Sequence, residues 1–280
     1  MKLVHRGKVK DIYEIEEDRY LFYFSDRISA FDIQMNTLIP RKGEVLCRFG
    51  EFWFRTLDTE NHMIAIQGPN KMIVKGLNMI PLECIVRGYF YGSMVDRFAK
   101  SAENFASLGD FNPVLAGKLP TPIFDPTTKS QEHDVPINER DIVSRGILSQ
   151  KILDYVKETS IHLYKNMSVV AEKAGFIIAD VKFEFGRDRV NGNILLADSL
   201  GPDEFRLWRK SEYNPGKIQE SYDKQILRDW IIKTGFKDVI DISVKDRFKP
   251  TAPVIPAKII NELSERYVYA YEQITGNKLN

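Results

Sequence analysis

The chain has 280 residues, of which 43% are hydrophobic, 11% aromatic and 28% charged, and 40 Lys and Arg against 39 Asp and Glu give a net charge of +1. This ordinary globular composition excludes a disordered, collagen-like or coiled-coil chain. A net charge near zero argues against non-specific adhesion to nucleic acid or to an anionic membrane, because such binding needs a large excess of Lys and Arg. Any anion binding must therefore be local.

Signals for targeting and for oxidised cysteines are absent from the sequence. The N-terminus lacks the apolar core of a signal peptide, and there is no window of about 18 apolar residues. Cys47 and Cys84 form no CxxC pair and lie in apolar surroundings, so we expect buried, reduced thiols and neither a disulfide nor a metal role. These features indicate a soluble, cytoplasmic protein.

Period-two alternation up to about residue 80 predicts an antiparallel sheet, with strands near 9–13, 20–25, 63–67 and 71–75. Within this region, segment 43–57 places Leu46, Phe49, Trp53 and Leu57 at helical spacing, which predicts a helix that covers one face of the sheet. We expect a boundary between two lobes near residue 80, with domains 1–80 and 81–280.

The second part of the chain mixes strand and helix signals. Segment 82–92 predicts a buried strand, 109–137 a long loop of functional rather than idle character, and 138–175 a helical region capped by Asn138 and Ser149 and ended by Gly175. A strand pair is predicted at 176–185 and 193–198, and helices at 223–234 and 256–275. The expected fold class is α+β in two lobes.

A charged row in segment 179–185 is the sharpest chemical signal. Strand alternation puts Asp180, Lys182 and Glu184 on one face, opposite an apolar face, and the next strand ends at Asp198. Carboxylates of this kind suit Mg²⁺, which takes one or two of them together with substrate phosphates. A solvated charged face of a two-layer sheet is the alternative.

The connection between these strands decides whether Glu184 and Asp198 share a face. Opposed residues of an antiparallel pair do so, so their numbers must sum to an even value. A two-residue Asn191-Gly192 loop gives an odd sum, whereas a three-residue loop from Val190, with Gly192 in the left-handed position of a bulged turn, gives an even one. We predict the three-residue loop or a bulge; a regular two-residue hairpin would count against a joint metal site.

Basic residues near the N-terminus offer a second candidate site. Lys8 and Lys10 share a strand face beside Gly7, an arrangement that can place ammonium and backbone N–H groups over polyphosphate. The segment is neither a Walker A loop nor GxGxxG, and an exposed basic strand is the alternative.

Three arginines pose the same question. Arg87 stands in an apolar run and needs an anionic partner, either an internal carboxylate or a ligand phosphate, and nearby Ser93 favours the ligand. Arg206 and Arg228 have ordinary surface pairing as their default. The sequence lacks GxSxG, HExxH and the protein kinase motifs.

Seven segments, in order over nearly the whole chain, resemble the SAICAR synthetases of purine biosynthesis (phosphoribosylaminoimidazole-succinocarboxamide synthases): GKVKDIYEI at 7–15, SDRISAFD at 25–32, PLECIVRGYFYGS at 81–93, FDPTTKSQEHD at 124–134, DVKFEFG at 180–186, LADSLGPDEFRLW at 196–208 and DKQILRDW at 223–230. Each motif is weak alone, and the ordered set is specific.

The resemblance implies an ATP-dependent ligase that joins L-aspartate to 5-aminoimidazole-4-carboxylate ribonucleotide (CAIR) and releases ADP and phosphate. It also implies a small N-terminal kinase-like antiparallel lobe and a larger ATP-grasp-like lobe, with ATP between them. The tail 246–280 and the long loop resemble the longer variants of the family, so the oligomeric state is not carried over from the shorter ones, and a homo-oligomer is one alternative.

The resemblance carries residue roles as well. It implies that Lys8, Lys10 and Glu83 bind ATP and that Glu184 and Asp198 hold Mg²⁺. Lys182 lies near the transferring phosphate and Asp180 shares its strand face, so both are catalytic candidates; direct ligation of the metal by Asp180 is an alternative that stays open. The positions that match CAIR-binding residues are Arg87, Ser93, Arg206 and Arg228. Asp32 and Lys129 are further substrate-site candidates, whereas Asp26, Arg27, Ser29, His133 and Asp134 match family motifs without an assigned role.

Two other functions remain to be weighed. A small-molecule kinase would share ATP, Mg²⁺ and the two-lobe fold, but it would not need Arg87, Arg206 and Arg228 together. A non-catalytic nucleotide sensor would not need both metal carboxylates, and both are intact here.

Overall fold

The computed structural model describes the chain except for residues 101–112, 130–134, 249 and 280. Contacts group the described residues into two compact units that are discontinuous in sequence. The first unit comprises 1–78, 186–203 and 221–280, and the second comprises 79–185 and 204–220. Each unit is built from antiparallel strands and helices, which confirms the expected α+β class.

The first unit contains a five-stranded antiparallel sheet, in the order β1 (Lys2–Arg6), β2 (Lys10–Glu16), β3 (Arg19–Phe24), β7 (Lys71–Lys75) and β6 (Met63–Gly68). A second, two-stranded sheet pairs β4 (Arg27–Ala30) with β5 (Ile33–Leu38). The alternation in the sequence predicts β2, β3, β6 and β7, but it misses β1, whose residues are all exposed.

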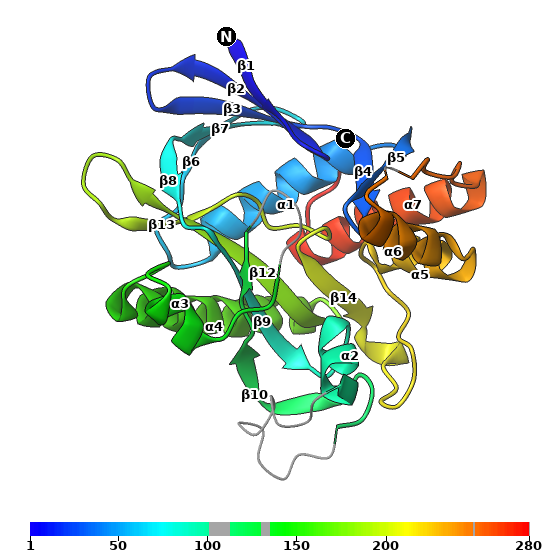
Figure 1. The fold of residues 1–280 in the computed structure, drawn as a ribbon. Coiled ribbons are helices and arrows are strands. Elements are labelled where there is room, and N and C mark those ends of the chain that lie inside the picture. The colour runs from blue at the N-terminus through cyan, green and yellow to red at the C-terminus, as the bar shows by residue number, and fades with distance from the viewer. Residues whose placement is uncertain (101–112, 130–134, 249, 280) are drawn as a thin grey trace. The chain divides into compact units, whose positions relative to one another are not determined.

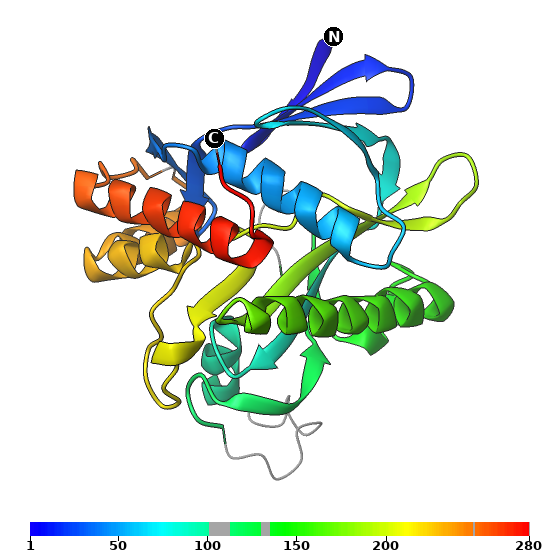
Figure 2. The same ribbon diagram turned by 180° about the vertical axis from the view of Figure 1, so that it is seen from behind.

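Four helices complete the first unit: α1 (Lys42–Thr56), α5 (Gln225–Lys233), α6 (Phe236–Asp246) and α7 (Ala257–Thr275). Helices α1 and α7 lie side by side (Figures 1 and 2), and the Phe49 and Tyr271 rings meet edge to face at 5.3 Å. The sequence predicts α1, α5 and α7 and misses α6. None of the helices in the described part of the chain is both long and apolar enough to cross a membrane.

The second unit is centred on two long antiparallel strands, β9 (Leu82–Tyr89) and β12 (Phe176–Asp188). Strand β9 also pairs with β10 (Lys118–Phe124) and β11 (Thr127–Thr128), and β12 pairs with β14 (Phe205–Arg209). Strands β10 and β11 lie within 109–137, so the expectation of one long loop is wrong there, because edge pairing to β9 orders a segment that has no periodicity of its own.

The described residues of the second unit form three α-helices, α2 (Ser93–Lys100), α3 (Glu139–Ser144) and α4 (Gln150–Lys173). Asn138 caps α3 by accepting the Asp141 N–H, and Gly175 follows α4 with φ 81°, as predicted. Ser149 precedes α4 but makes no side-chain cap bond. A 3₁₀ turn, Lys210–Glu212, follows β14.

Strand β13 (Ile194–Ala197) follows β12 and pairs with it, and the connection between these two strands belongs to the first unit. Strand β8 (Leu77–Met79) lies where the chain passes for the first time from the first unit to the second. Asp188 donates its N–H to the Asn193 carbonyl at 2.8 Å and accepts the Gly192 N–H at 3.0 Å. Gly192 has φ 75°, so two residues oppose one in a bulged turn. The regular two-residue hairpin is therefore excluded and a bulged turn is present, but the predicted three-residue loop is wrong. Four residues, 189–192, separate Asp188 from its partner Asn193, and the numbers of this pair sum to an odd value, so the pairing at this turn does not put Glu184 and Asp198 on one face.

Candidate functional site

A backbone hydrogen bond closes the basic turn at residues 7–10. Gly7 donates its N–H to the Lys10 carbonyl at 2.9 Å, and a Cβ on Gly7 would lie 2.8 Å from that oxygen. Only glycine fits there without a shift of the backbone. Lys8 extends from this turn and pairs with Asp32 at 2.5 Å, and both side chains are about half exposed.

An ion pair between Arg27 and the buried Asp11 holds the same turn. Arg27 contacts both carboxylate oxygens of Asp11, at 2.5 and 3.3 Å, and donates to the Gly7 carbonyl at 3.1 Å. Asp11 is buried. Arg27, which matched a family motif without a role, therefore fixes the turn, and Asp26 accepts the Gly43 N–H at 2.9 Å near the start of α1.

Lys10 points toward Asp198 and forms an ion pair with it within the first unit. Its ammonium group also lies over the Phe22 ring, 4.6 Å from the centroid, and its side chain is mostly buried. Asp198 follows β13 with φ 61°, and its carbonyl contacts the His62 ring at 3.1 Å. Because Asp198 has left the regular strand, the direction of its side chain is set by this turn and not by the pairing parity.

In the second unit, the strand register gathers the charged row. Asp180 of β12 faces Arg87 of β9, and Lys182 faces Ile85, so the expected face of β12 is shared with β9. The opposite face, with Val181, Phe183 and Phe185, is fully buried as predicted.

Lys182 is held between two carboxylates on that shared face. Its ammonium group lies 2.9 Å from Glu83 and 3.1 Å from Glu184, and Glu83 also accepts from the Thr127 hydroxyl at 2.9 Å. Burial would lower the pKa of Lys182, but the adjacent Glu184 and Glu83 outweigh it and raise that pKa. Lys182 therefore stays protonated at neutral pH and acts as a cation.

Glu184 does not face open solvent. Its side chain is 4% exposed, and Lys129 from the segment after β11 also pairs with it. Two lysines therefore cover the carboxylate. His133 and Asp134 lie outside the described residues.

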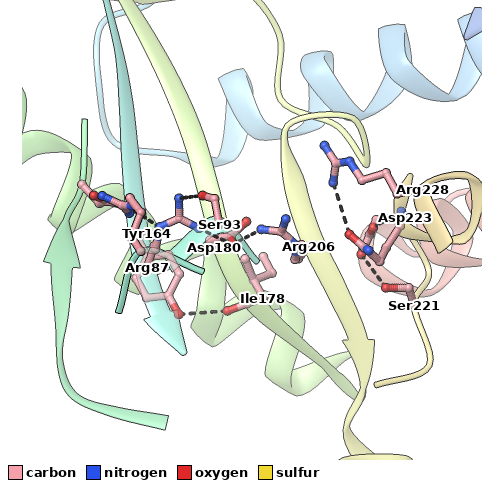
Figure 3. Close-up of polar contacts among 12 residues, drawn as sticks. Arg87, Ser93, Tyr164, Ile178, Asp180, Arg206, Ser221, Asp223 and Arg228 are labelled. Atoms are coloured by element: carbon pink, nitrogen blue, oxygen red, sulfur yellow. Dashed lines mark hydrogen bonds and ion pairs between the residues drawn. The ribbon is translucent and has the colours of Figure 1, made fainter. Parts of the chain in front are cut away.

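Arg87 is buried and fully oriented by internal partners. Its Nε donates to Asp125 at 2.5 Å, one Nη to Asp180 at 3.3 Å and the other to the Ser93 hydroxyl at 3.1 Å (Figure 3). The sequence left open whether Arg87 has an internal carboxylate as its partner, and the structure provides two, Asp125 and Asp180.

Arg206 of β14 points at the same carboxylate of Asp180 from the other side (Figure 3). Gly92 lies directly against it with φ 65°, and a Cβ there would come within 2.6 Å of the Arg206 guanidinium. In the first unit, Arg228 of α5 contacts Gln225 at 3.5 Å, and buried Asp223 accepts from Ser221 and from the Gln225 N–H.

Sequence reasoning missed several residues of these groups, notably Asp11, Arg97 and Asp125. Arg97 of α2 donates to Asp125, the same carboxylate that Arg87 contacts. No local pattern marks these residues, although an acidic residue just before proline in 124–126 is a weak signal for a fixed side chain. Their importance depends on contacts across the fold.

The carboxylates of Glu184 and Asp198, with the lysines beside them, are compatible with binding of a Mg²⁺–nucleotide. Among the described residues, no three His, Cys, Asp or Glu side chains are grouped closely enough to hold a metal ion by themselves. Mg²⁺ bound with a polyphosphate needs only one or two carboxylates. Glu184 in the second unit lies beside Lys129 and Lys182, and Asp198 in the first unit lies beside Lys10, so each unit by itself offers a carboxylate next to an ammonium group.

The fold and the charged groups on its strands are those of an α+β enzyme that acts on small anionic molecules. A family model described as SAICAR synthetase matches residues 3–242. The phosphoribosylaminoimidazole-succinocarboxamide synthase of Nitrosopumilus maritimus is 47% identical over 100% of both chains, and that of Candida maltosa is 38% identical over 99% of this chain and 95% of the relative.

Solved structures agree with these sequence matches. SAICAR synthase from Saccharomyces cerevisiae, complexed with SAICAR, has a TM-score of 0.85 at 33% identity and covers 99% of this chain and 96% of its own. A SAICAR synthetase in complex with ADP has a TM-score of 0.74 at 26% identity over 99% of both chains. The chain therefore belongs to the SAICAR synthetase family, the ATP-dependent ligases of purine biosynthesis.

Proposed function

We propose that this chain condenses L-aspartate with CAIR, with ATP and Mg²⁺, to give SAICAR, ADP and phosphate. The observation that carries the proposal is the shared face of β9 and β12, where a guanidinium–carboxylate group and a lysine–carboxylate group are two residues apart along one strand. A complex of a homologous synthase with SAICAR and one of another synthetase with ADP support it.

The chemistry requires these residue types. A carboxylate is a poor electrophile, and an amine does not displace oxide from it. We propose phosphoryl transfer from ATP to the CAIR carboxylate, followed by attack of the aspartate amine on the acyl phosphate and release of phosphate. Both steps concentrate negative charge, so positioning and electrostatic stabilisation are the enzyme's main contributions.

CAIR is assigned to the arginine set. Guanidinium groups bind phosphate and carboxylate through paired N–H donors, and a serine hydroxyl adds one more donor. The residues proposed to bind CAIR are Arg87, Ser93, Arg206 and Arg228. Asp32 and Lys129 are proposed to belong to the substrate site, and Asp180 is proposed to hold two of the arginines in place.

ATP is assigned to Lys8, Lys10 and Glu83, and Mg²⁺ to Glu184 and Asp198. The metal, when bound, would neutralise charge on the phosphates. Lys182 is proposed to stabilise the transferring phosphate as a cation, since its raised pKa argues against a role as a base. The same proposal keeps the expected division of the chain, in which 1–80 covers ATP and 81–280 carries the substrate and metal sites.

ADP release by the purified protein tests the function. The assay contains ATP and Mg²⁺ with CAIR and L-aspartate together, and each is then omitted in turn. Release that requires both, with SAICAR as product, supports the ligase. Release with neither, or only with an added alcohol, would move the function to a small-molecule kinase. Assembly into a homo-oligomer is tested separately by sedimentation of the same preparation.

A further inference from the structure

Five charged side chains alternate in sign through the second unit. Arg97 and Arg87 both donate to Asp125, and Arg87 and Arg206 both donate to Asp180. Three guanidinium groups thus share two carboxylates, and the group keeps one net positive charge. We call these residues, Arg97, Asp125, Arg87, Asp180 and Arg206, the arginine–aspartate chain.

Arg87 lies at the centre of this chain and is the most enclosed of its arginines. Its side chain is 4% exposed, against 15% for Arg206 and 27% for Arg97. Each of its three nitrogens already has a fixed partner, in Asp125, Asp180 and Ser93. Charge-assisted bonds are strong where water is excluded, so these contacts set the orientation of the guanidinium before any ligand binds.

Asp125 is itself rigidly placed. Its backbone N–H donates to the Ile85 carbonyl at 2.8 Å, which ties it to β9 two residues before Arg87. On the other side, α2 presents Ser93 and Arg97 one helical turn apart, so one helix contacts both Arg87 and Asp125. The carboxylate is therefore positioned by β9 and by α2.

Asp125 remains charged under ordinary conditions. Burial would raise its pKa, but the guanidinium groups of Arg87 and Arg97 outweigh burial and hold that pKa below its usual value. The link between Arg97 and Arg87 through this carboxylate therefore persists at every pH at which the enzyme is expected to work.

We propose that Asp125, braced by Arg97, is a positioning residue that orients Arg87 for the anionic group of the substrate. The inference rests on the role of Arg87 proposed above. Asp125 would not touch the substrate; it would hold the guanidinium in the geometry that binding needs, so that less order is lost when the ligand arrives.

The direction in which substrate binding changes when Asp125 loses its charge distinguishes a positioning residue from a simple counter-ion. Removing a negative charge beside an anion site raises the local positive potential, which by itself strengthens the binding of an anion. If Asp125 positions Arg87, its removal instead weakens binding despite the added positive charge. The two roles therefore predict opposite changes.

The experiment is calorimetric titration of CAIR, without ATP or metal, into the wild-type protein and into Asp125→Asn, which keeps the shape and removes the charge. We expect the Kd of CAIR to rise about tenfold. In the full reaction, the KM for CAIR should rise in parallel, while kcat and the KM for ATP stay within about twofold of wild type. An unchanged or lower Kd would overturn the proposal.

Two further variants complete the design. Glu139→Gln removes an ion pair to Lys157 elsewhere in the second unit and should leave the Kd unchanged. Arg97→Lys keeps the charge but loses the fork of donors on the partly exposed helix α2, so it should raise the Kd about threefold even if Asp125→Asn does not fold. An unchanged Kd of CAIR in Arg97→Lys would contradict the role of Arg97 in holding Asp125.

Arg87→Ala distinguishes a failure of the proposed role of Arg87 in CAIR binding from a failure of the positioning role of Asp125. If it leaves the Kd of CAIR unchanged, the proposed role of Arg87 fails, and the positioning role fails with it. If it weakens CAIR binding while Asp125→Asn does not, only the positioning role of Asp125 is wrong.

Discussion

Charged residues buried in apolar segments find their partners in this fold through distant parts of the chain. Arg87 contacts Asp125 and Asp180, which are 38 and 93 positions away in the sequence. Lys182 likewise contacts Glu83, 99 positions away. The residue types indicate that partners must exist, because an unpaired buried charge is costly, but only the register of β9 and β12 identifies them.

Glu184 provides the first test of the proposed metal site. Glu184→Gln keeps the volume of the side chain and removes a charge that a Mg²⁺ ligand needs, so we expect the Mg²⁺ requirement for ADP release to rise by about 100-fold. Asp198→Asn should behave alike. Titration of activity against Mg²⁺ measures the effect, and thermal unfolding checks the fold.

Glu172→Gln serves as the matched control for these variants, since it breaks only an exposed ion pair to Lys210. Wild-type Mg²⁺ dependence in both Glu184→Gln and Asp198→Asn would remove these carboxylates from the metal site.

The two cysteines give a second test at this scale. Cys47 and Cys84 are free and buried, as predicted, and burial raises the pKa of each thiol to about 12. Since the thiolate is the reactive form, we expect neither residue to react with iodoacetamide at pH 8 in the native protein. Mass spectrometry should show both alkylated after unfolding in urea; labelling of the native chain would contradict their burial.

At the scale of elements, the contact between α4 and β9 depends on a missing side chain. The Tyr164 hydroxyl donates to the Ile178 carbonyl at 2.9 Å, and its ring lies directly against Gly88. A Cβ on Gly88 would come within 1.8 Å of that hydroxyl oxygen. The glycine beside Arg87 therefore serves the packing of a helix.

Gly88→Ala should consequently destabilise the protein by about 3 kcal/mol, because the helix or the strand must move to admit the methyl group. Urea unfolding measures the change. The cost should be smaller when the same substitution is made in a Tyr164→Leu protein, which lacks the hydroxyl and ring carbon nearest the new atom. Equal costs in both backgrounds would show that Tyr164 is not the obstacle.

At the scale of the whole molecule, each unit joins segments that are far apart in sequence. In the first unit, the Asp203 carboxylate lies 2.9 Å from Lys42 of α1, 3.5 Å from Lys224 and 2.9 Å from the Tyr267 hydroxyl of α7. Lys42 is fully buried and Asp203 nearly so. One carboxylate thus ties the N-terminal third of the chain to its last helix.

Removing the charge of Asp203 should lower the free energy of unfolding, by an amount that depends on pH. Burial would raise the pKa of Asp203, but Lys224, Lys42 and Tyr267 outweigh it and hold the pKa below its usual value. The ionised carboxylate therefore contributes its full stability above the unfolded pKa of about 4, and this is lost as the pH falls through the folded pKa. Asp203→Asn should cost about 3–5 kcal/mol at pH 7.

The difference in unfolding free energy between wild type and Asp203→Asn should shrink as the pH is lowered from 5 toward 2. Urea unfolding at a series of pH values measures it, with Asp18→Asn as a control that breaks only a half-exposed pair to Arg189. A difference that stays constant with pH would mean that Asp203 does not act through its charge.

Much of the local structure follows from the sequence. Alternation locates β2, β3, β6 and β7, an apolar run locates β9, and helical spacing locates α1 and α7. The cap residues Asn138 and Gly175 lie where they were predicted. Short elements that depend on pairing for their order, such as β10, β11 and α2, leave no such pattern. The charged row on β12 and Arg87 could be found, but Asp125, which contacts Arg87, and Arg97, which contacts Asp125, could not.

The sequence by itself determined the family, the strand faces and the residue types at the site, because periodicity and ordered motifs are local and survive without a fold. Tertiary structure decided which charges meet, since antiparallel register and helix packing join positions that no short-range rule connects. Thus Lys182 of β12 meets Glu83 of β9, and Lys42 meets Asp203. The physical reason is that ionic contacts need closeness in space, which only the packed chain provides.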